Sequence, residues 1–92
     1  MNVAAQSPKG PQEGVPTRFT WHAEGVEPPF TFVLLGAGYD EMVRVGGIGG
    51  TSFTPDRGVA AVLATGGTFH WFVAGKAGAR LCRSPLQTVE IR

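Results

Sequence analysis

The stretch GGTFHWFVA at residues 66–74 decides the fold class of this 92-residue chain. After a pair of glycines, Phe69 and Trp71 alternate with His70 and Phe72. Successive side chains of a β-strand point to opposite faces of its sheet. The alternation therefore predicts a strand whose Phe69 and Trp71 side chains turn inward while His70 and Phe72 turn outward.

The same alternation recurs through the rest of the chain, and clusters of the 14 glycines and 7 prolines separate the alternating segments. Further strands are predicted at 3–6, 18–22, 30–35, 41–45, 51–54 and 87–91, the last after a break near Ser84 and Pro85. Their inward side chains include Phe19, Trp21, Phe30, Phe32, Leu34, Val89 and Ile91. About seven short strands without regular helix–strand alternation predict an all-β fold, an antiparallel two-sheet sandwich.

One short helical turn is predicted near 57–64. Asp56 precedes this segment and is suited to cap its first turn. Val59, Val62 and Leu63 fall on one face of such a helix. About two turns of helix are too short to be stable alone, so we expect the segment to pack against the sheets.

We expect a single β-sandwich domain at 7–92, preceded by a linker and an edge strand within 1–16. Prolines and glycines interrupt this first segment, and proline in a sheet is confined to edges and strand starts. Residues 1–15 have neither a basic start nor a long apolar run, so no signal peptide is expected there. No window approaches 18 apolar residues, so no direct membrane insertion is expected.

The charge pattern narrows the class of partner. Eight lysines and arginines face seven aspartates and glutamates, and no stretch concentrates one sign. Nucleic-acid binding normally requires a basic surface, so we expect no nucleic-acid partner. Only 16% of the residues are charged, against about a quarter in an average protein. Such a neutral surface favours contact with another protein or a neighbouring domain.

The reactive side chains give no enzyme signature. Cys82 is the sole cysteine of the sequence, which excludes an intrachain disulfide and a cysteine-rich zinc site. We expect its side chain to be buried or half-buried. His22 and His70 are predicted to be solvated on the outward faces of strands in different sheets. No nucleophile elbow or Ser-His-Asp order is present. We therefore expect a non-catalytic protein with no cofactor and no metal site.

The glycine-rich stretch VGGIGGTS at 45–52 is the candidate for a phosphate-binding loop in this chain. A dinucleotide-binding loop requires a third glycine that opens a helix, and a nucleotide P-loop requires a lysine before its hydroxyl residue. Neither requirement is met, since Ser52 lies within a predicted strand. We expect instead a flexible connection from one sheet to the other, with glycine at positive φ.

Three segments together resemble a fibronectin type III or immunoglobulin-like domain of the bacterial type. They are RFTW at 18–21, TSFTP at 51–55 and GGTFHWFVAGKAG at 66–78. The resemblance covers about 7–92 and implies the two-sheet sandwich, not an activity. Phe53 and Phe69 stand where the family often has tyrosine, and no Arg-Gly-Asp motif is present. The resemblance implies an accessory domain of a larger bacterial protein, outside the cytoplasm.

An apolar cluster is predicted on the outside of the sandwich. Val33 and Leu35 alternate with inward side chains, as Phe72 does, and the resemblance implies that their two strands are neighbours. Val33, Leu35 and Phe72 would then form an exposed patch, and such patches mark interfaces. The alternative is that loops or the N-terminal segment cover it.

These observations lead to three alternative hypotheses about function. The leading hypothesis is a module that contacts another protein or domain through Val33, Leu35 and Phe72, with a second copy as one such partner. A carbohydrate-binding module is the first alternative, with Tyr39 and Phe72 as its candidate aromatic residues. The second is an accessory domain of an exported enzyme or of a membrane-anchored, anti-sigma-type regulator.

Overall fold

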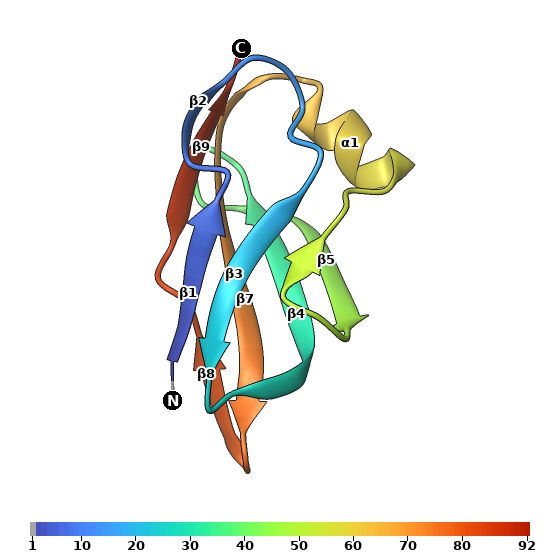
Figure 1. The fold of residues 1–92 in the computed structure, drawn as a ribbon. Helices are drawn as coiled ribbons and strands as arrows, with labels where there is room; N and C mark the ends of the chain where they lie inside the picture. Colours follow the sequence, from blue (N-terminus) through green and yellow to red (C-terminus); the bar gives the residue numbers. More distant parts are fainter. Residues whose placement is uncertain (1) are drawn as a thin grey trace.

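A computed structural model describes residues 2–92 and arranges them in two β-sheets with one short helix (Figure 1). In chain order the elements are β1 (Asn2–Ser7), β2 (Gly10–Gln12), β3 (Phe19–Glu24), β4 (Glu27–Leu35), β5 (Glu41–Ile48), β6 (Ser52–Phe53), α1 (Arg57–Leu63), β7 (Gly67–Ala77), β8 (Arg80–Arg83) and β9 (Gln87–Ile91). The predicted all-β fold with two sheets is confirmed.

The two sheets have unequal sizes. The smaller sheet has the order β1-β3-β6, and the larger has the order β2-β9-β7-β4-β5, with β8 also paired to β7. All pairs are antiparallel except β2 with β9. The chain leaves the larger sheet after β5 and enters the smaller one at β6, so the glycine-rich stretch does cross between sheets. Gly47 takes the expected positive φ, 71°, but it lies within β5, where the register with β4 shifts, and only residues 49–51 connect the two sheets.

The inner faces of the two sheets enclose one aromatic core. The Phe19 ring, from β3, meets the rings of Phe32 and Trp71 edge-on at centroid distances of 4.8 Å and 5.1 Å. Trp21, also from β3, lies 5.9 Å from Phe30. All five side chains are buried, which confirms the predicted inward faces of 18–22, 30–35 and 68–74. Edge-to-face ring pairs add to the stabilisation that burial of these rings already provides.

The N-terminal segment differs from the predicted linker. After β1 pairs with β3 as the expected edge strand, Gly10–Gln12 pairs in parallel with β9 of the other sheet. Residues 2–12 therefore contribute strands to both sheets, and the indole N–H of Trp71 donates to the Pro8 carbonyl at 3.2 Å. Pro11 is tolerated because β2 is the outermost strand of its sheet.

Two strands of the larger sheet begin or end beyond their predicted limits. β4 begins at Glu27, although the prolines at 28 and 29 predict a turn there. β7 continues beyond residue 74, the end of the predicted strand, to Ala77 and forms a hairpin with β8. Gly75 allows this continuation, because a Cβ there would lie 2.8 Å from the Phe30 ring.

Helix α1 forms where it was predicted. The Oδ1 atom of Asp56 accepts a hydrogen bond from the backbone N–H of Val59 at 2.9 Å, so the aspartate caps the first turn. Val59 and Leu63 are buried in the core, as the helical spacing indicated. The described residues contain no helix of the length and apolar character that crossing a membrane requires.

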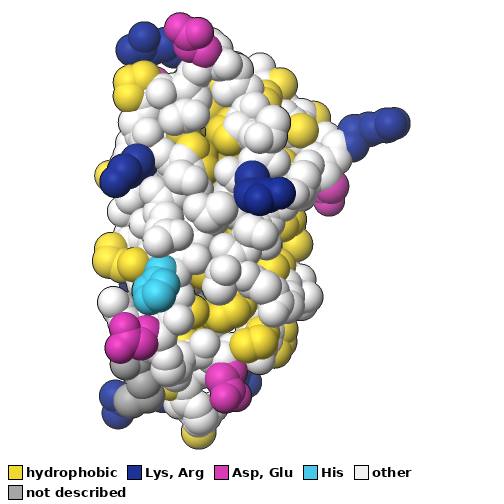
Figure 2. All heavy atoms as spheres, viewed as in Figure 1, with side chains coloured by type: hydrophobic (Ala, Val, Ile, Leu, Met, Phe, Trp, Pro, Cys, Tyr) yellow, Lys and Arg dark blue, Asp and Glu magenta, His cyan; other side chains and the backbone are white. Residues whose placement is uncertain are grey.

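The face that carries β1 and β3 shows no concentration of charge. Figure 2 shows basic and acidic side chains scattered singly over it, with apolar side chains along the flank near β5 and β6. This face offers no continuous basic surface for a phosphate backbone. The outer face of the larger sheet, on the other side, is where the predicted interface residues lie.

Candidate functional site

Val33, Leu35 and Phe72 share the outer face of the larger sheet, as predicted. Val33 of β4 lies opposite Phe72 of β7 and, on its other side, opposite Arg44 of β5. The predicted exposure is wrong for Val33, whose exposed fraction is 0%, and Leu35 is only 9% exposed. A short valine flanked by two longer side chains on the same face is covered by them. Phe72 is half-buried and remains within reach of solvent.

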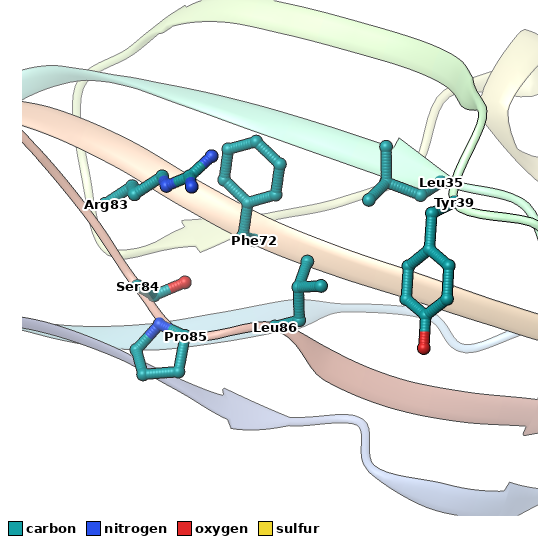
Figure 3. A pocket seen from close by; sticks show the side chains of 7 residues that line it. All are labelled: Leu35, Tyr39, Phe72, Arg83, Ser84, Pro85 and Leu86. Carbon is teal, nitrogen blue, oxygen red and sulfur yellow. The ribbon is translucent and has the colours of Figure 1, made fainter.

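A hollow of about 240 Å³ lies on this outer face, beside Phe72. It is lined by Leu35, Tyr39, Phe72, Arg83, Ser84, Pro85 and Leu86 (Figure 3). The lining comes from β4, β7, the end of β8, the loop after β4 and the break between β8 and β9. Figure 3 shows Leu86 between the rings of Phe72 and Tyr39, and Arg83 turned toward Phe72. The structure therefore brings together two of the predicted interface residues and both aromatic candidates of the carbohydrate hypothesis.

The break between β8 and β9 builds one wall of the hollow. Ser84 stays attached to β7: its N–H donates to the Val73 carbonyl at 2.8 Å, and its hydroxyl accepts from the Val73 N–H at 3.0 Å. The hydroxyl thus satisfies a backbone donor that a continuous strand would have satisfied. Pro85 follows, and Leu86 emerges 48% exposed at the rim. The sequence indicated the break but not its role in this wall.

Tyr39 forms the opposite wall from a tight loop. The Gly36 N–H donates to the Asp40 carbonyl at 2.8 Å, and the Tyr39 N–H donates to the Gly36 carbonyl at 2.9 Å. Tyr39 has a φ of 65°, a left-handed conformation that a residue with a Cβ adopts at an energetic cost. Its side chain is nevertheless 60% exposed. The loop therefore holds a large aromatic ring at the rim of the hollow.

His70 is not solvated, contrary to the prediction. Its side chain does point to the outer face, but it is only 7% exposed. The Tyr39 ring stacks on the imidazole with a centroid distance of 4.3 Å and an interplanar angle of 11°. The Nδ1 atom lies 2.9 Å from the hydroxyl oxygen of Thr88 on β9, within hydrogen-bond distance. His22, by contrast, is exposed as predicted.

Arg83 is the charged group of the hollow. Its guanidinium carbon lies 5.5 Å from the centroid of the Phe72 ring, a cation–π arrangement. Within residues 2–92 the structure shows one ion pair, between Arg44 and Glu41, and Arg83 takes part in none. No carboxylate lines the hollow. Its surface is therefore apolar with a single positive charge at one side.

The Arg44–Glu41 pair lies at the β5 edge of the same outer face. Arg44 Nη2 is 2.6 Å from Glu41 Oε1. The hydrogen bond from Arg44 lowers the pKa of Glu41 and raises the pKa of the guanidinium, and the attraction between the charges acts in the same direction. Both side chains are exposed, so the pair contributes little to stability.

The remaining candidates are structural in this fold. Cys82 is a free, half-buried thiol packed against the core, as predicted. Gly46 and Gly47 lie within β5, and Ile48 still pairs with Phe30. This part of the glycine-rich stretch is therefore strand and does not form a phosphate-binding loop before a helix. Among the described residues, no group of three or more histidine, cysteine or acidic side chains is placed to hold a metal ion.

Comparisons of this chain with protein-family models, with curated proteins and with solved structures give no match. The fold and the hollow are therefore the observations on which a function can be based.

Proposed function

We propose that this chain is a non-catalytic β-sandwich module of the fibronectin type III or immunoglobulin-like class that contacts another protein. Two facing sheets, with a chain that crosses between them, support that class. The surface that makes the contact is the outer face of the larger sheet around Leu35 and Phe72. Val33 lies beside Phe72 and Arg44 on the same face but is fully buried, so it does not form part of the exposed contact area.

The hollow beside Phe72 is the observation that carries this proposal. An apolar depression with exposed Tyr39 and Leu86 at its rim offers shape as well as apolar area. Binding energy at protein interfaces concentrates where a side chain of one partner fills a desolvated pocket of the other. Residues held rigidly at the rim reduce the entropy that is lost on association.

Self-association is the direct test of this surface. The mass of the wild-type chain, measured by sedimentation from micromolar to millimolar concentration, should rise above the 9.7 kDa of the monomer. Phe72→Arg should keep the mass at the monomer value, because it places a charge in the apolar contact. Met42→Arg makes the same chemical change at an exposed site outside the hollow and should behave as the wild type. A constant monomer mass for the wild type contradicts contact between copies.

Carbohydrate binding is the second candidate, because Tyr39 and Phe72 line the same hollow. A sugar needs hydrogen-bond acceptors for its hydroxyls, and one of the two lone pairs of the Ser84 hydroxyl already accepts from the Val73 N–H. No carboxylate or amide side chain is part of the lining. Protein contact therefore fits the lining better. Glycan-array binding that Tyr39→Ala abolishes would favour the carbohydrate function.

The cellular location of the module and the kind of protein that contains it are part of the same proposal. The resemblance implies a location outside the cytoplasm in a larger bacterial protein, as an accessory domain of an exported enzyme or an anti-sigma-type regulator. The parent open reading frame tests this part. A membrane-spanning segment in that frame would favour the regulator, and a catalytic domain would favour the enzyme.

A further inference from the structure

We propose that the hollow binds an acidic peptide segment of a partner protein, in which a carboxylate lies next to one apolar side chain. The apolar side chain enters between Phe72 and Leu86, and a flanking carboxylate pairs with Arg83. This inference rests on the proposed function and names the chemistry of the partner.

The size of the hollow favours a single side chain as its occupant. Its volume of about 240 Å³ lies below the range of about 300–1,000 Å³ that is typical of small-molecule sites. An apolar cavity of about 150 Å³ already accommodates a benzene molecule. The hollow therefore has room for one leucine- or phenylalanine-sized group but not for a whole cofactor.

The lining determines which groups the partner must bring. Leu35, Phe72, Pro85 and Leu86 are apolar, so they favour an apolar group at the centre. The Ser84 hydroxyl already accepts from the Val73 N–H. Arg83 carries five donors and no acceptor, and no hydrogen bond to them is found in the described chain. The partner must therefore supply acceptors next to its apolar group.

The charges around the hollow favour a carboxylate as that acceptor. Arg83 is the one charged residue of the lining, whereas Lys76 of β7 lies opposite Glu27 of β4 and Arg80 lies opposite Ala77, outside the lining. Glu41, on the same outer face, is already engaged by its bond to Arg44. Guanidinium–carboxylate pairs form strong, charge-assisted hydrogen bonds. A segment with a carboxylate next to its apolar anchor complements Arg83.

The side chains that would meet the peptide are already held in place. The Arg83 guanidinium lies against the Phe72 ring, and the Tyr39 ring lies against His70. The left-handed backbone of Tyr39 indicates that the loop orients this ring at some cost. Groups fixed before binding lose less entropy when a ligand arrives.

An NMR titration of the isotope-labelled full chain with blocked tripeptides tests the proposal. Acetyl-Asp-Leu-Asp-amide should produce saturable shifts at the amides of Phe72, Arg83, Ser84 and Leu86. Acetyl-Asp-Gly-Asp-amide, which lacks the apolar side chain, and acetyl-Lys-Leu-Lys-amide, which reverses the charge, should produce none. Absence of saturable shifts with the acidic leucine peptide at millimolar concentration overturns the proposal, as does equal binding of all three peptides.

Two arginine variants test the role assigned to the charge. Arg83→Gln should weaken binding of the acidic leucine peptide about tenfold, the loss expected for one charge-assisted hydrogen bond. Arg80→Gln, on the same strand but outside the lining, should bind within about twofold of the wild type, because charges outside the contact are screened by salt. Unchanged binding by Arg83→Gln contradicts the assignment.

The peptide titration and the sedimentation experiment test different claims, so one can fail while the other succeeds. If the wild type self-associates through Phe72 but binds no acidic peptide, the proposed function stands and the acidic partner is wrong. If the peptide binds while the mass stays monomeric, the contact is with another chain. If both fail, the outer face is not a contact surface.

Discussion

The two faces of β7 carry aromatic residues in alternation, but they belong to different environments. On the inner face, Phe69, Trp71 and Val73 are covered by the smaller sheet and have little or no exposed area. On the outer face, Phe72 is covered only in part, and His70 is covered by side chains that include the Tyr39 ring. The alternation assigns each residue to a face, and what packs against that face decides whether it becomes core or contact surface.

Replacing Trp71 should have the largest effect, because it removes the centre of the inner face. Trp71→Ala loses the contacts of its ring with Phe19 and Phe32 and the hydrogen bond to the Pro8 carbonyl. We expect the free energy of unfolding to fall by about 3–5 kcal/mol in chemical denaturation. Leu81→Ala, at a 68% exposed outer position, should change it by less than about 0.5 kcal/mol. Equal losses would remove the distinction between the faces.

A substitution at Gly75 tests the packing of the inner face by adding a methyl group rather than by removing a side chain. A Cβ at this position would lie 2.7 Å from Val26 Cγ1 and 2.8 Å from Phe30 Cδ1, inside the packed core. Gly75→Ala should therefore destabilise the fold by about 1–3 kcal/mol, the usual cost of overpacking. Gly49→Ala is the matched control, since a Cβ there meets nothing within 4 Å. A thermal-unfolding midpoint of Gly75→Ala equal to that of Gly49→Ala would contradict the described packing.

Phe72 should contribute less to stability than its inner-face neighbour. Its ring is half-buried, and full burial of such a side chain stabilises by about 1.5–3 kcal/mol. Phe72→Ala should therefore cost about 1 kcal/mol in denaturant unfolding while it abolishes binding of the acidic leucine peptide. A cost as large as that of Trp71→Ala would make Phe72 a core residue and leave its contact role without support.

The smallest effect is expected at the β5 edge of the outer face. The pKa of Glu41 is lowered in the folded state by its hydrogen bond to Arg44, so the pair stabilises above the unfolded pKa of the glutamate. This stabilisation disappears as the pH falls through the lower, folded pKa. Glu41→Gln should therefore unfold at a slightly lower temperature than the wild type at neutral pH and at the same temperature in strong acid. A difference in unfolding temperature between the two proteins that grows as the pH falls would contradict the lowered pKa of Glu41.

Local sequence rules predicted the inner face well, because it follows from backbone periodicity. Alternation at 68–74 placed Trp71 correctly, the spacing from Asp56 gave the capped helix, and Gly49 and Gly50 lie at the predicted crossing between sheets. Each of these features depends on residues close together in the chain. The parallel pairing of β2 with β9 joins segments about 80 residues apart and has no local signal.

The outer face was predicted in part, because its exposure depends on neighbours from other strands. Val33 is buried by side chains that the register places beside it, and His70 by a tyrosine from a loop 31 positions away in the chain. Leu86 followed a recognised break, but only the bonds of Ser84 show that the break lies against β7. The exposed aromatic of a glycine-rich loop, Tyr39, was the one sequence signal for the hollow's rim.

Side-chain NMR with a soluble paramagnetic agent most directly tests the claim that adjacent residues of β7 serve the core and the contact surface. The Trp71 indole signal should stay unattenuated at all concentrations, since the ring is fully buried. The Phe72 ring signals should be attenuated in dilute protein and become protected when acetyl-Asp-Leu-Asp-amide is added. Equal attenuation of both rings, or a Phe72 signal that the peptide leaves unchanged, would contradict the account.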